Sequence, residues 1–347
     1  MKALVYENFN GPLWLNQAAD PVATADGVVI AVRATGVCRS DWHGWQGHDA
    51  DIKSLPHVPG HEFAGEVIEI GREVTKWRVG DRVTMPFVAG CGTCPECQAG
   101  AAQVCDRQFQ PGFTAWGSFA EAVAVRYADF NLVRLPPEMD FVTVASFGCR
   151  LATAYRAVAI QGQVAASDCV AIHGCGGLGL SAVMIAAALG ARPIAIDIHD
   201  EALALATQFG AAHVLNARQV EDVPDAIYQL TGRGADMSLD ALGSGETAGN
   251  SLRCLRKRGR HIQVGLLAGD QAQPRLPMEL VIARELEIYG SHGLAAADYA
   301  PLLSLVAAGT LNPRRLVRRI ISLAEAPAAL AELGAFNHAG ITMIEFP

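Results

Sequence analysis

The amino-acid sequence predicts an α/β protein made of a strand-rich module and a module with a parallel sheet. The chain has 347 residues, which is long for one hydrophobic core, so we expect two domains. Short β-branched runs broken by Gly, Pro and Asp fill residues 1–147, as in an all-β module. From residue 148, apolar strands alternate with Ala- and Leu-rich helices. Repeated βα units of this kind form parallel sheets covered by helices.

The elements follow in order along the chain. The first module should contain the strands VVIAVRATGV, HEFAGEVIEI and GDRVTMPFV. The alternating part begins with the strand CVAIHG and the helix GLSAVMIAAAL, and then runs through RPIAIDI, EALALATQFG, AHVLNA, VEDVPDAIYQLTG and ADMSLDALG. A helix is expected over residues 246–259, ETAGNSLRCLRKRG, before the strands HIQVGLL and ELEIYGS. Beyond residue 291, two helical stretches and the strand ITMIEF should fold back onto the first module.

The composition excludes several classes of protein. Apolar residues make up 51% and charged residues 18%, as in globular domains. The net charge of −8 argues against a nucleic-acid partner. The densest basic group is interpreted as a solvated helix end and comprises Arg253, Arg256, Lys257, Arg258 and Arg260. No membrane-spanning run or secretory signal is recognisable, so the nine cysteines favour a reducing compartment and we expect a cytoplasmic protein.

A glycine-rich loop follows the first strand of the alternating part. In HGCGGLGLSAV, Gly174, Gly176 and Gly179 form the pattern G-x-G-x-x-G. Its place between an apolar strand and a helix is the context in which backbone N–H groups hold a dinucleotide pyrophosphate. Asp197 closes the next strand, where a carboxylate binds ribose hydroxyls and repels a 2′-phosphate, which favours NAD over NADP. The alternative interpretation is a simple glycine-rich turn with a solvated aspartate.

Four cysteines crowd into the loop GCGTCPECQAGAAQVC. Cys91, Cys94, Cys97 and Cys105 have the spacing C-x2-C-x2-C-x7-C. Four thiolates suit a closed tetrahedral zinc site with a structural role, although an iron–sulfur cluster also uses such a spacing.

A second set of possible metal ligands is dispersed along the chain. Cys38 lies in GVCRSDWHGW, His61 and Glu62 lie in VPGHEFAGEV, and Cys149 lies in FGCRLATAYRAV. Two thiolates and one imidazole would leave a fourth zinc position open for catalysis. By spacing alone, buried cysteines and an ordinary core histidine explain these residues as well.

Taken together, the motifs GVCRSDWH, GHEFAGEV, the four-cysteine loop, GCRLATAY and GCGGLG resemble those of zinc-dependent alcohol dehydrogenases of the medium-chain dehydrogenase/reductase superfamily. The resemblance spans essentially the whole chain. It implies a GroES-like catalytic domain over residues 1–150 and 291–347, and a Rossmann NAD-binding domain over residues 151–290.

The resemblance also implies roles for individual residues. The implied catalytic zinc ligands are Cys38, His61 and Cys149, with Glu62 as the adjacent carboxylate and Asp41 as the carboxylate that orients the imidazole. The implied structural zinc ligands are the four loop cysteines. The implied cofactor contacts are Arg39 at the pyrophosphate, Gly174, Gly176, Gly177 and Gly179 in the loop, Asp197 at the ribose, and Thr153 and Val264 at the nicotinamide.

Ser40 and His43 resemble the family's proton relay. In the family, zinc acidifies the alcohol and NAD accepts the hydride, while the serine and the nicotinamide ribose pass the proton to the histidine. Histidine, with an unperturbed pKa of about 6.5, both accepts and releases that proton. The local alternatives are that Ser40 caps a short helix and that His43 is a surface imidazole. The remaining histidines, His48 and His338 among them, are interpreted as structural or surface residues.

Three aromatic residues bear on the choice of substrate. Phe87 matches an aromatic residue that narrows the family's substrate cleft, and Trp45 and Trp116 could line the same cleft or simply pack in the core. We expect a primary alcohol, aliphatic or aromatic, with secondary alcohols as a further option. Within the superfamily, cysteine at position 149 speaks against the runner-up, a polyol or threonine dehydrogenase. A non-catalytic protein that binds NAD and zinc is the third alternative, and the family resemblance implies a homotetramer.

Overall fold

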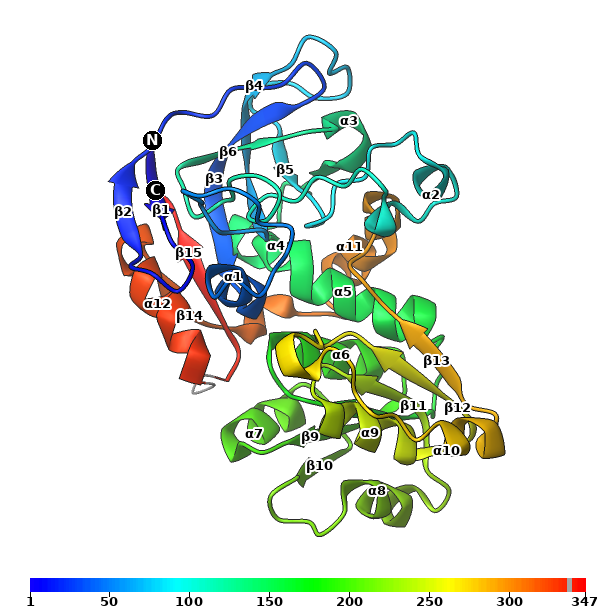
Figure 1. The fold of residues 1–347 in the computed structure, drawn as a ribbon. Helices are drawn as coiled ribbons and strands as arrows, with labels where there is room; N and C mark the ends of the chain where they lie inside the picture. The colour runs from blue at the N-terminus through cyan, green and yellow to red at the C-terminus, as the bar shows by residue number, and fades with distance from the viewer. Residues whose placement is uncertain (336–338) are drawn as a thin grey trace. The chain divides into compact units, whose positions relative to one another are not determined.

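The computed structural model describes residues 1–335 and 339–347, so His338 lies outside the described part. The described chain divides into two compact units. The first contains Met1–Ala152, Gly293–Ala307 and Asn312–Pro347, and the second contains Thr153–His292 and Ala308–Leu311. The expected boundaries, 150/151 and 290/291, differ from these by two residues, and residues 308–311 were expected in the first domain. Each unit is described by itself below (Figure 1).

The first unit is built on a seven-stranded sheet with the order β14-β15-β3-β4-β5-β7, in which β6 also pairs with β3. Its strands are β3 (Val28–Val37), β4 (Phe63–Ile70), β5 (Arg82–Thr84), β6 (Ala122–Val125), β7 (Val133–Arg134), β14 (Val317–Ile321) and β15 (Ile341–Glu345), beside the pair β1 (Lys2–Val5) and β2 (Trp14–Gln17). Its helices are α1 (Arg39–Trp45), α2 (Pro95–Gln98), α3 (Ala128–Asn131), α4 (Phe141–Ala145), α11 (Tyr299–Ala307) and α12 (Ala326–Glu332), with a π-helical turn at Phe147–Leu151.

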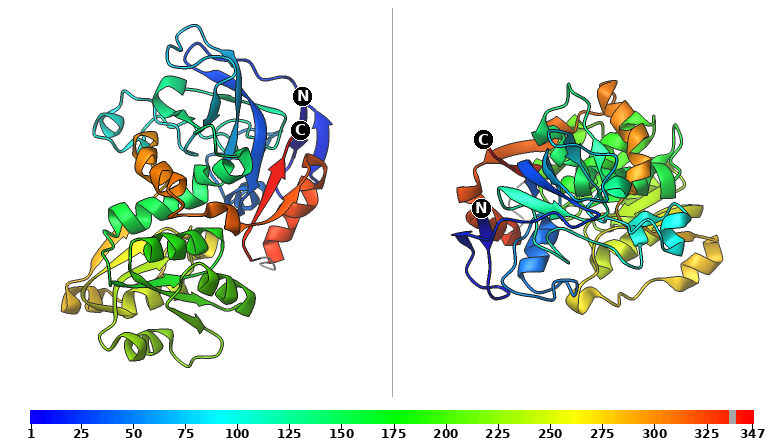
Figure 2. Two further views of the ribbon diagram at one scale, coloured as in Figure 1. Left: turned by 180° about the vertical axis from the view of Figure 1, so that it is seen from behind. Right: turned by 90° about the horizontal axis from the view of Figure 1, so that it is seen from above.

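Strand β3 is the centre of this sheet. It pairs antiparallel with β4, β6 and β15, and nearly all its residues are buried. β15 lies directly beside its end, with Thr342 opposite Val37. Figure 2 also shows that the two chain termini lie near each other in this unit. This pairing confirms that the C-terminal tail folds back onto the first module.

The second unit contains a six-stranded sheet with the order β10-β9-β8-β11-β12-β13, and every pair in it is parallel. Its strands are β8 (Cys169–His173), β9 (Arg192–Asp197), β10 (His213–Asn216), β11 (Ala235–Asp240), β12 (Leu255–Gln263) and β13 (Glu287–Gly290). Its helices are α6 (Gly177–Ala188), α7 (Asp200–Gln208), α8 (Val223–Thr231), α9 (Gly245–Arg253) and α10 (Met278–Arg284), and α5 (Ala152–Tyr155) begins at the last residue of the first unit.

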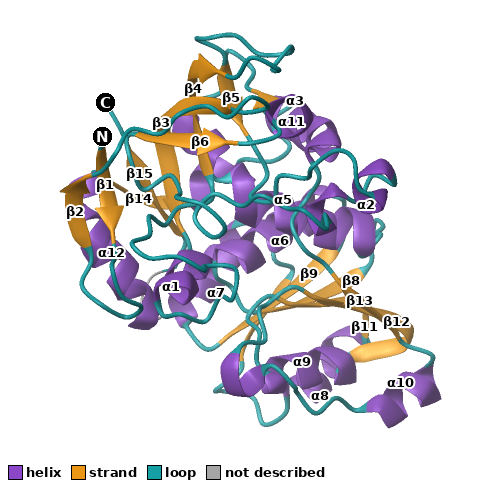
Figure 3. Cartoon of the chain, turned by 45° about the horizontal axis from the view of Figure 1, so that its top comes forward, coloured by secondary structure: helices purple, strands orange, loops and turns teal. Residues whose placement is uncertain are grey.

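Helices cover this parallel sheet on both faces (Figure 3). α6 and α7 pack against each other on one face, and α8, α9 and α10 pack together on the other. The strand order reverses at β8, whose neighbours are β9 and β11. Such a reversal leaves a crevice at the carboxyl ends of the strands, where α/β sheets bind ligands. The expected α/β fold class is confirmed.

One predicted element is wrong. Residues 246–259 were expected to be one helix, but α9 ends at Arg253 and β12 begins at Leu255. Arg256 and Arg260 form ion pairs with Asp236 and Glu287 instead of lying at a helix end. Leu, Arg and Lys favour helices locally. That preference is overridden because Leu255 pairs with β11 and the following residues 260–263 pair with both β11 and β13.

No helix in residues 1–335 and 339–347 combines the length and apolar character needed to cross a bilayer.

The core of the first unit makes a quantitative prediction. Ile30 of β3 is fully buried in a cluster with Val67 and Val83, so Ile30→Ala should lower the free energy of unfolding by about 2–5 kcal/mol. Ile68 of β4 is half exposed, and Ile68→Ala is the matched control, with an expected loss below about 1 kcal/mol. Urea unfolding followed by tryptophan fluorescence measures both, and equal losses would contradict this assignment of the core.

Candidate metal and cofactor sites

Three separate stretches of the first unit bring four potential metal ligands together. Cys38 follows β3, His61 and Glu62 precede β4, and Cys149 lies in the π-helical turn. One ligand atom from each lies within 4.8 Å of those of the other three. The strands fix two of these positions, because β3 and β4 are paired along most of their length.

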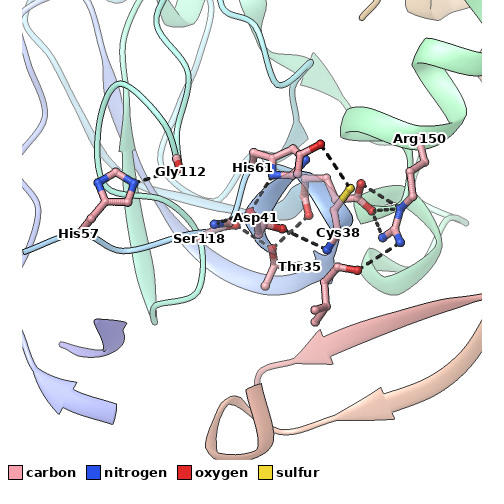
Figure 4. A network of polar contacts seen from close by, with 12 residues as sticks. Thr35, Cys38, Asp41, His57, His61, Gly112, Ser118 and Arg150 are labelled. Atoms are coloured by element: carbon pink, nitrogen blue, oxygen red, sulfur yellow. Dashed lines mark hydrogen bonds and ion pairs between the residues drawn. The ribbon is translucent and has the colours of Figure 1, made fainter. Parts of the chain in front are cut away.

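Asp41 holds the imidazole of His61 in one orientation. Its buried carboxylate accepts hydrogen bonds from His61 Nδ1 at 2.8 Å, from the Gly60 backbone at 2.9 Å and from the Cys38 backbone at 3.0 Å (Figure 4). The Nδ1 proton leaves a lone pair on Nε2, and buried Nε2 has no hydrogen-bond partner among the described residues. Although burial lowers the pKa of His61, Asp41 raises it overall, which makes the imidazole a stronger ligand.

The two thiols have unequal acidities. Hydrogen bonding with Cys149 lowers the pKa of the Cys38 thiol well below its usual range, and the same interaction together with burial raises the pKa of Cys149. Cys149 therefore keeps its proton and donates it to the Cys38 sulfur. A metal ion that binds both sulfur atoms would displace this proton. An unpartnered imidazole nitrogen beside two thiols suits zinc, which prefers nitrogen and sulfur ligands.

Glu62 is held by Arg150, which the sequence analysis did not single out. Arg150 Nε donates to both Glu62 carboxylate oxygens at 3.0 and 3.1 Å, and its Nη2 donates to Oε1. Arg150 Nη1 also donates to the carbonyl oxygen of Val37 at 3.2 Å. Burial raises the pKa of Glu62, while the guanidinium acts to lower it. The only sign of this role in the sequence is that Arg150 directly follows Cys149, a candidate metal ligand.

A glycine makes room for this ion pair. A Cβ on Gly36 would lie 2.2 Å from Glu62 Oε1 and 2.6 Å from Arg150 Nη2. The last residues of β3 therefore approach the carboxylate more closely than any larger residue permits.

The four-cysteine loop forms a second cluster. Its Sγ atoms all lie within 4.8 Å of one another. Backbone N–H groups of Cys91 and Arg107 donate to Cys105 Sγ, both at 3.2 Å, and Arg107 Nη2 donates to Cys91 Sγ at 3.4 Å. Such bonds favour the thiolate form. Burial acts to raise the pKa of Cys91, but hydrogen bonds, first of all with Thr93, lower it to about 5, whereas burial raises the pKa of Cys105 in spite of its two backbone donors. The nine cysteines all lie in the described part of the chain and are free, so this cluster suits a tetrahedral metal site without an open position.

The glycine-rich loop of the second unit has the geometry of a phosphate cradle. Gly174 has φ +96°, a conformation that favours glycine. A Cβ on Gly179 would lie 1.8 Å from the Gly174 oxygen, whereas a Cβ on Gly176 would meet nothing within 4 Å. Gly176 is thus the open position, directly before α6, which begins at Gly177. A helix start with free N–H groups and open space above it fits a phosphate group.

Asp197 braces this loop from the end of β9. It accepts hydrogen bonds from the backbone of Cys175 at 2.7 Å, from the backbone of Ile198 at 2.7 Å, and from His199. The carboxylate is thereby fixed next to the loop. Elsewhere in this unit, Val264 N donates to the Asp240 carbonyl at 3.1 Å, and buried Thr153 Oγ1 has no hydrogen-bond partner among the described residues.

Helix α1 carries Ser40 and His43 on one face, since they are three residues apart. Ser40 Oγ lies 4.0 Å from Cys38 Sγ. His43 Nδ1 lies 3.1 Å from Nδ1 of His48, a contact that the sequence analysis missed. Arg39 stacks on the Trp42 ring at 4.4 Å and donates to the Leu333 carbonyl. The short helix that was the local alternative for this stretch is present, but its N-cap residue is Cys38, not Ser40.

The aromatic residues expected to line the pocket divide into two groups. Phe87 contacts the His61 ring edge-on, with 6.0 Å between centroids, and Phe113, which was not predicted, lies 5.0 Å from the same ring. Trp45 and Trp116 instead pack against the apolar cluster around β1, and their indole N–H groups donate to the carbonyls of Gly11 and Pro56.

Comparisons with known proteins agree with this arrangement. Residues 24–137 match the family model for an alcohol dehydrogenase GroES-like domain, and residues 177–308 match the model for a zinc-binding dehydrogenase. The chain is 32% identical to the NAD-dependent alcohol dehydrogenase of Sulfurisphaera tokodaii, covering 98% of each chain. It is also 32% identical to the sorbitol dehydrogenase of Halalkalibacterium halodurans, covering 94% of each. The solved structure of alcohol dehydrogenase TADH from Thermus sp. ATN1 superposes with a TM-score of 0.89 at 31% identity, covering 99% of each chain.

The buried ion pair predicts a stability effect. Arg150→Met leaves the Glu62 carboxylate buried without a cation and should lower the free energy of unfolding by about 3–5 kcal/mol. Adding Glu62→Gln should recover part of that loss because it removes the charge. Arg33→Met is the matched control, since the Arg33–Glu66 pair is partly exposed and should contribute less than about 1 kcal/mol. If the double variant is as unstable as both single losses added together, the two side chains do not interact as described.

Proposed function

The chain belongs to the zinc-dependent alcohol dehydrogenases of the medium-chain dehydrogenase/reductase superfamily, and we propose that it reversibly oxidises primary or secondary alcohols to aldehydes or ketones with NAD+. The observation that carries the proposal is the buried, unpartnered Nε2 of His61, which faces two thiols and is held in place by Asp41.

Cys38, His61 and Cys149 would hold the catalytic zinc, and the four loop cysteines would hold a structural zinc. When bound, the catalytic zinc supplies a Lewis acid that makes the alcohol proton acidic, and NAD+ supplies the acceptor for the hydride. The chain's own residues have three tasks around this chemistry: to fix the ligands, to hold the cofactor and to remove the proton.

Asp41 fixes the tautomer of His61, and Arg150 holds the Glu62 carboxylate by its guanidinium. Ser40, one turn before His43 on α1, is the hydroxyl that would accept the substrate's proton and pass it on to His43. Phe87 and Phe113 cover the ring of His61 and would exclude water from that side, which strengthens the electrostatic effects there.

In the second unit, Gly174, Gly176, Gly177 and Gly179 would cradle the pyrophosphate at the start of α6. Asp197 would bind the adenosine ribose and disfavour a 2′-phosphate. Arg39 at the pyrophosphate, with Thr153 and Val264 at the nicotinamide, completes the proposed cofactor contacts.

Assembly and location are part of the proposal as well. The edge strand β13 leaves Ile288 and Tyr289 exposed, and an open apolar edge can continue its sheet into a second copy. This supports pairing of two copies through β13, which is one of the contacts that the proposed homotetramer requires. Free cysteines throughout the described chain are in keeping with a reducing cytoplasm.

A polyol dehydrogenase is the second candidate, because the sorbitol dehydrogenase of Halalkalibacterium halodurans is as similar as the alcohol dehydrogenase reported above. Cys149 in the third ligand position favours the alcohol dehydrogenase reaction. A protein that binds zinc and NAD without turnover would be the third outcome.

The deciding experiment measures NADH formation from NAD+ with ethanol, hexanol, benzyl alcohol, 2-butanol, sorbitol and threonine. We expect turnover with the simple alcohols and little with sorbitol or threonine, and we expect NADP+ to be the poorer cofactor. A preference for sorbitol would establish the polyol reaction. Silence across the panel, from protein that holds two zinc ions and binds NADH, would overturn the proposed activity.

Metal content separates the two clusters. Each of the variants Cys38→Ser and Cys97→Ser should lose one of two zinc ions per chain, measured by atomic emission. Cys38→Ser should lower kcat by at least ~100-fold, as expected when Lewis-acid catalysis is lost. Cys97→Ser should mainly lower the melting temperature, because a structural site contributes folding energy. A Cys38→Ser variant with two zinc ions and full activity would contradict the ligand assignment.

A further inference from the structure

His43 is in contact with a second imidazole that the proposed relay does not use. The Nδ1 atoms of His43 and His48 lie 3.1 Å apart, and the ring centroids are separated by 5.4 Å. His43 is the fifth residue of α1, and His48 lies in the turn after that helix. The helix also places His48 by its backbone, because His48 N donates to the His43 carbonyl at 3.0 Å.

The Nδ1–Nδ1 contact restricts where the protons lie. A hydrogen bond between two ring nitrogens requires one donor and one acceptor, so the two neutral rings must be opposite tautomers. If His43 carries its proton on Nδ1, then its Nε2 is an acceptor, while His48 carries its proton on Nε2. Each Nε2 lies on the side of its ring away from the shared bond. The pair therefore has an accepting end at His43 and a donating end at His48.

Trp42 holds both rings in this arrangement. Its indole meets the His43 ring edge-on at 5.0 Å and the His48 ring edge-on at 5.8 Å. The Trp42 ring is itself held by Arg39, whose guanidinium stacks on it at 4.4 Å. The two imidazoles are therefore packed against a common aromatic side chain, so their alignment does not depend on one hydrogen bond.

The surroundings of His43 disfavour its charged form. Burial, Arg39 and His48 lower the pKa of His43 to about 4, and Cys38 acts weakly in the opposite direction. Helix α12 packs against α1, and its carboxylate Glu332 forms an ion pair with Arg319. With its pKa lowered to about 4, His43 is mainly neutral at pH 7. A proton that reaches His43 must leave it quickly, and His48 is exposed to solvent.

We propose that His43 and His48 form a two-imidazole proton wire that carries the alcohol proton from Ser40 to solvent. This inference rests on the proposed function, since it extends the relay of that reaction. His48 would be the residue that delivers the proton to water, and Trp42 would be a positioning residue for both rings.

The transfer balances without any further reactant. One proton binds Nε2 of His43, the Nδ1 proton of His43 moves to Nδ1 of His48, and the Nε2 proton of His48 passes to water. No heavy atom moves and no electron is transferred. In aldehyde reduction the three proton transfers run in reverse, from water through His48 to His43. Exchange with water restores the starting tautomers between turnovers, because His43 is partly exposed and His48 is exposed.

The test compares His48→Gln with His213→Gln, which removes an exposed histidine from β10 of the second unit. The measured quantity is the single-turnover rate of NADH formation from the best alcohol of the panel, in dilute buffer at pH 7. We expect His48→Gln to slow this step by roughly tenfold, within the range of a lost proton-transfer group. Added imidazole should restore the rate, and at pH 9.5 the difference should vanish because hydroxide accepts the proton directly. His213→Gln should behave as the unchanged protein.

An NMR measurement tests the pair without turnover. In the zinc-loaded protein, 15N shifts should show opposite tautomers for His43 and His48. Removing His48 removes a charge repulsion, so His48→Gln should raise the pKa of His43, and the acidic limb of the pH–rate profile should move to higher pH.

Two results would overturn the wire. One is an unchanged single-turnover rate for His48→Gln in dilute buffer. The other is a slowing that is equal at all pH values and insensitive to imidazole, which would indicate a structural role. If the unchanged protein oxidises no alcohol, the proposed function fails instead, and the NMR result still decides whether the two imidazoles are paired: identical tautomers would exclude the pairing.

Discussion

The buried carboxylate of Asp41 is the interaction on which the metal centre depends. It accepts one hydrogen bond each from the backbone of Cys38, the backbone of Gly60 and the ring of His61. These residues come from the end of β3 and from the segment before β4, so one side chain joins two stretches far apart in sequence. A buried anion with unsatisfied partners would cost several kcal/mol. The same three bonds that stabilise the carboxylate therefore also fix the positions of two of the ligands, Cys38 and His61.

A second buried carboxylate, that of Glu62, lies beside the same ligand cluster. Glu62 follows His61 directly in the sequence, yet it points to a different partner, Arg150. The guanidinium compensates this second buried carboxylate, whose negative charge would otherwise add to that of the Cys38 thiolate. Gly36 leaves the space that this pair occupies. The two buried carboxylates thus have different partners. Asp41 accepts from His61 and orients that ligand, whereas Glu62 accepts from Arg150 and is held beside the cluster.

The dinucleotide-binding loop differs from the metal centre because nearly all its residues are close together in the sequence. Gly174, Gly176 and Gly179 lie within six residues of one another, and their roles follow from backbone conformation and steric limits. Only Asp197 is contributed from the next strand, and parallel pairing of β8 with β9 brings it there. The α/β alternation that predicted the parallel sheet therefore also predicted where the loop and its carboxylate would meet.

The sequence by itself determined the fold class, the parallel sheet, the glycine loop and the four-cysteine cluster. In each case the signal is a short-range period or spacing, and neighbours in sequence stay neighbours in space. Spacing alone left Cys38, His61 and Cys149 open to ordinary explanations, and it took the resemblance of the whole set of motifs to join them. Tertiary structure decided three further points: that residues 255–259 form a strand, that Arg150 pairs with Glu62, and that His43 meets His48. The physical reason is that strand pairing and buried charges depend on partners brought close by folding, and local propensity carries no information about those partners.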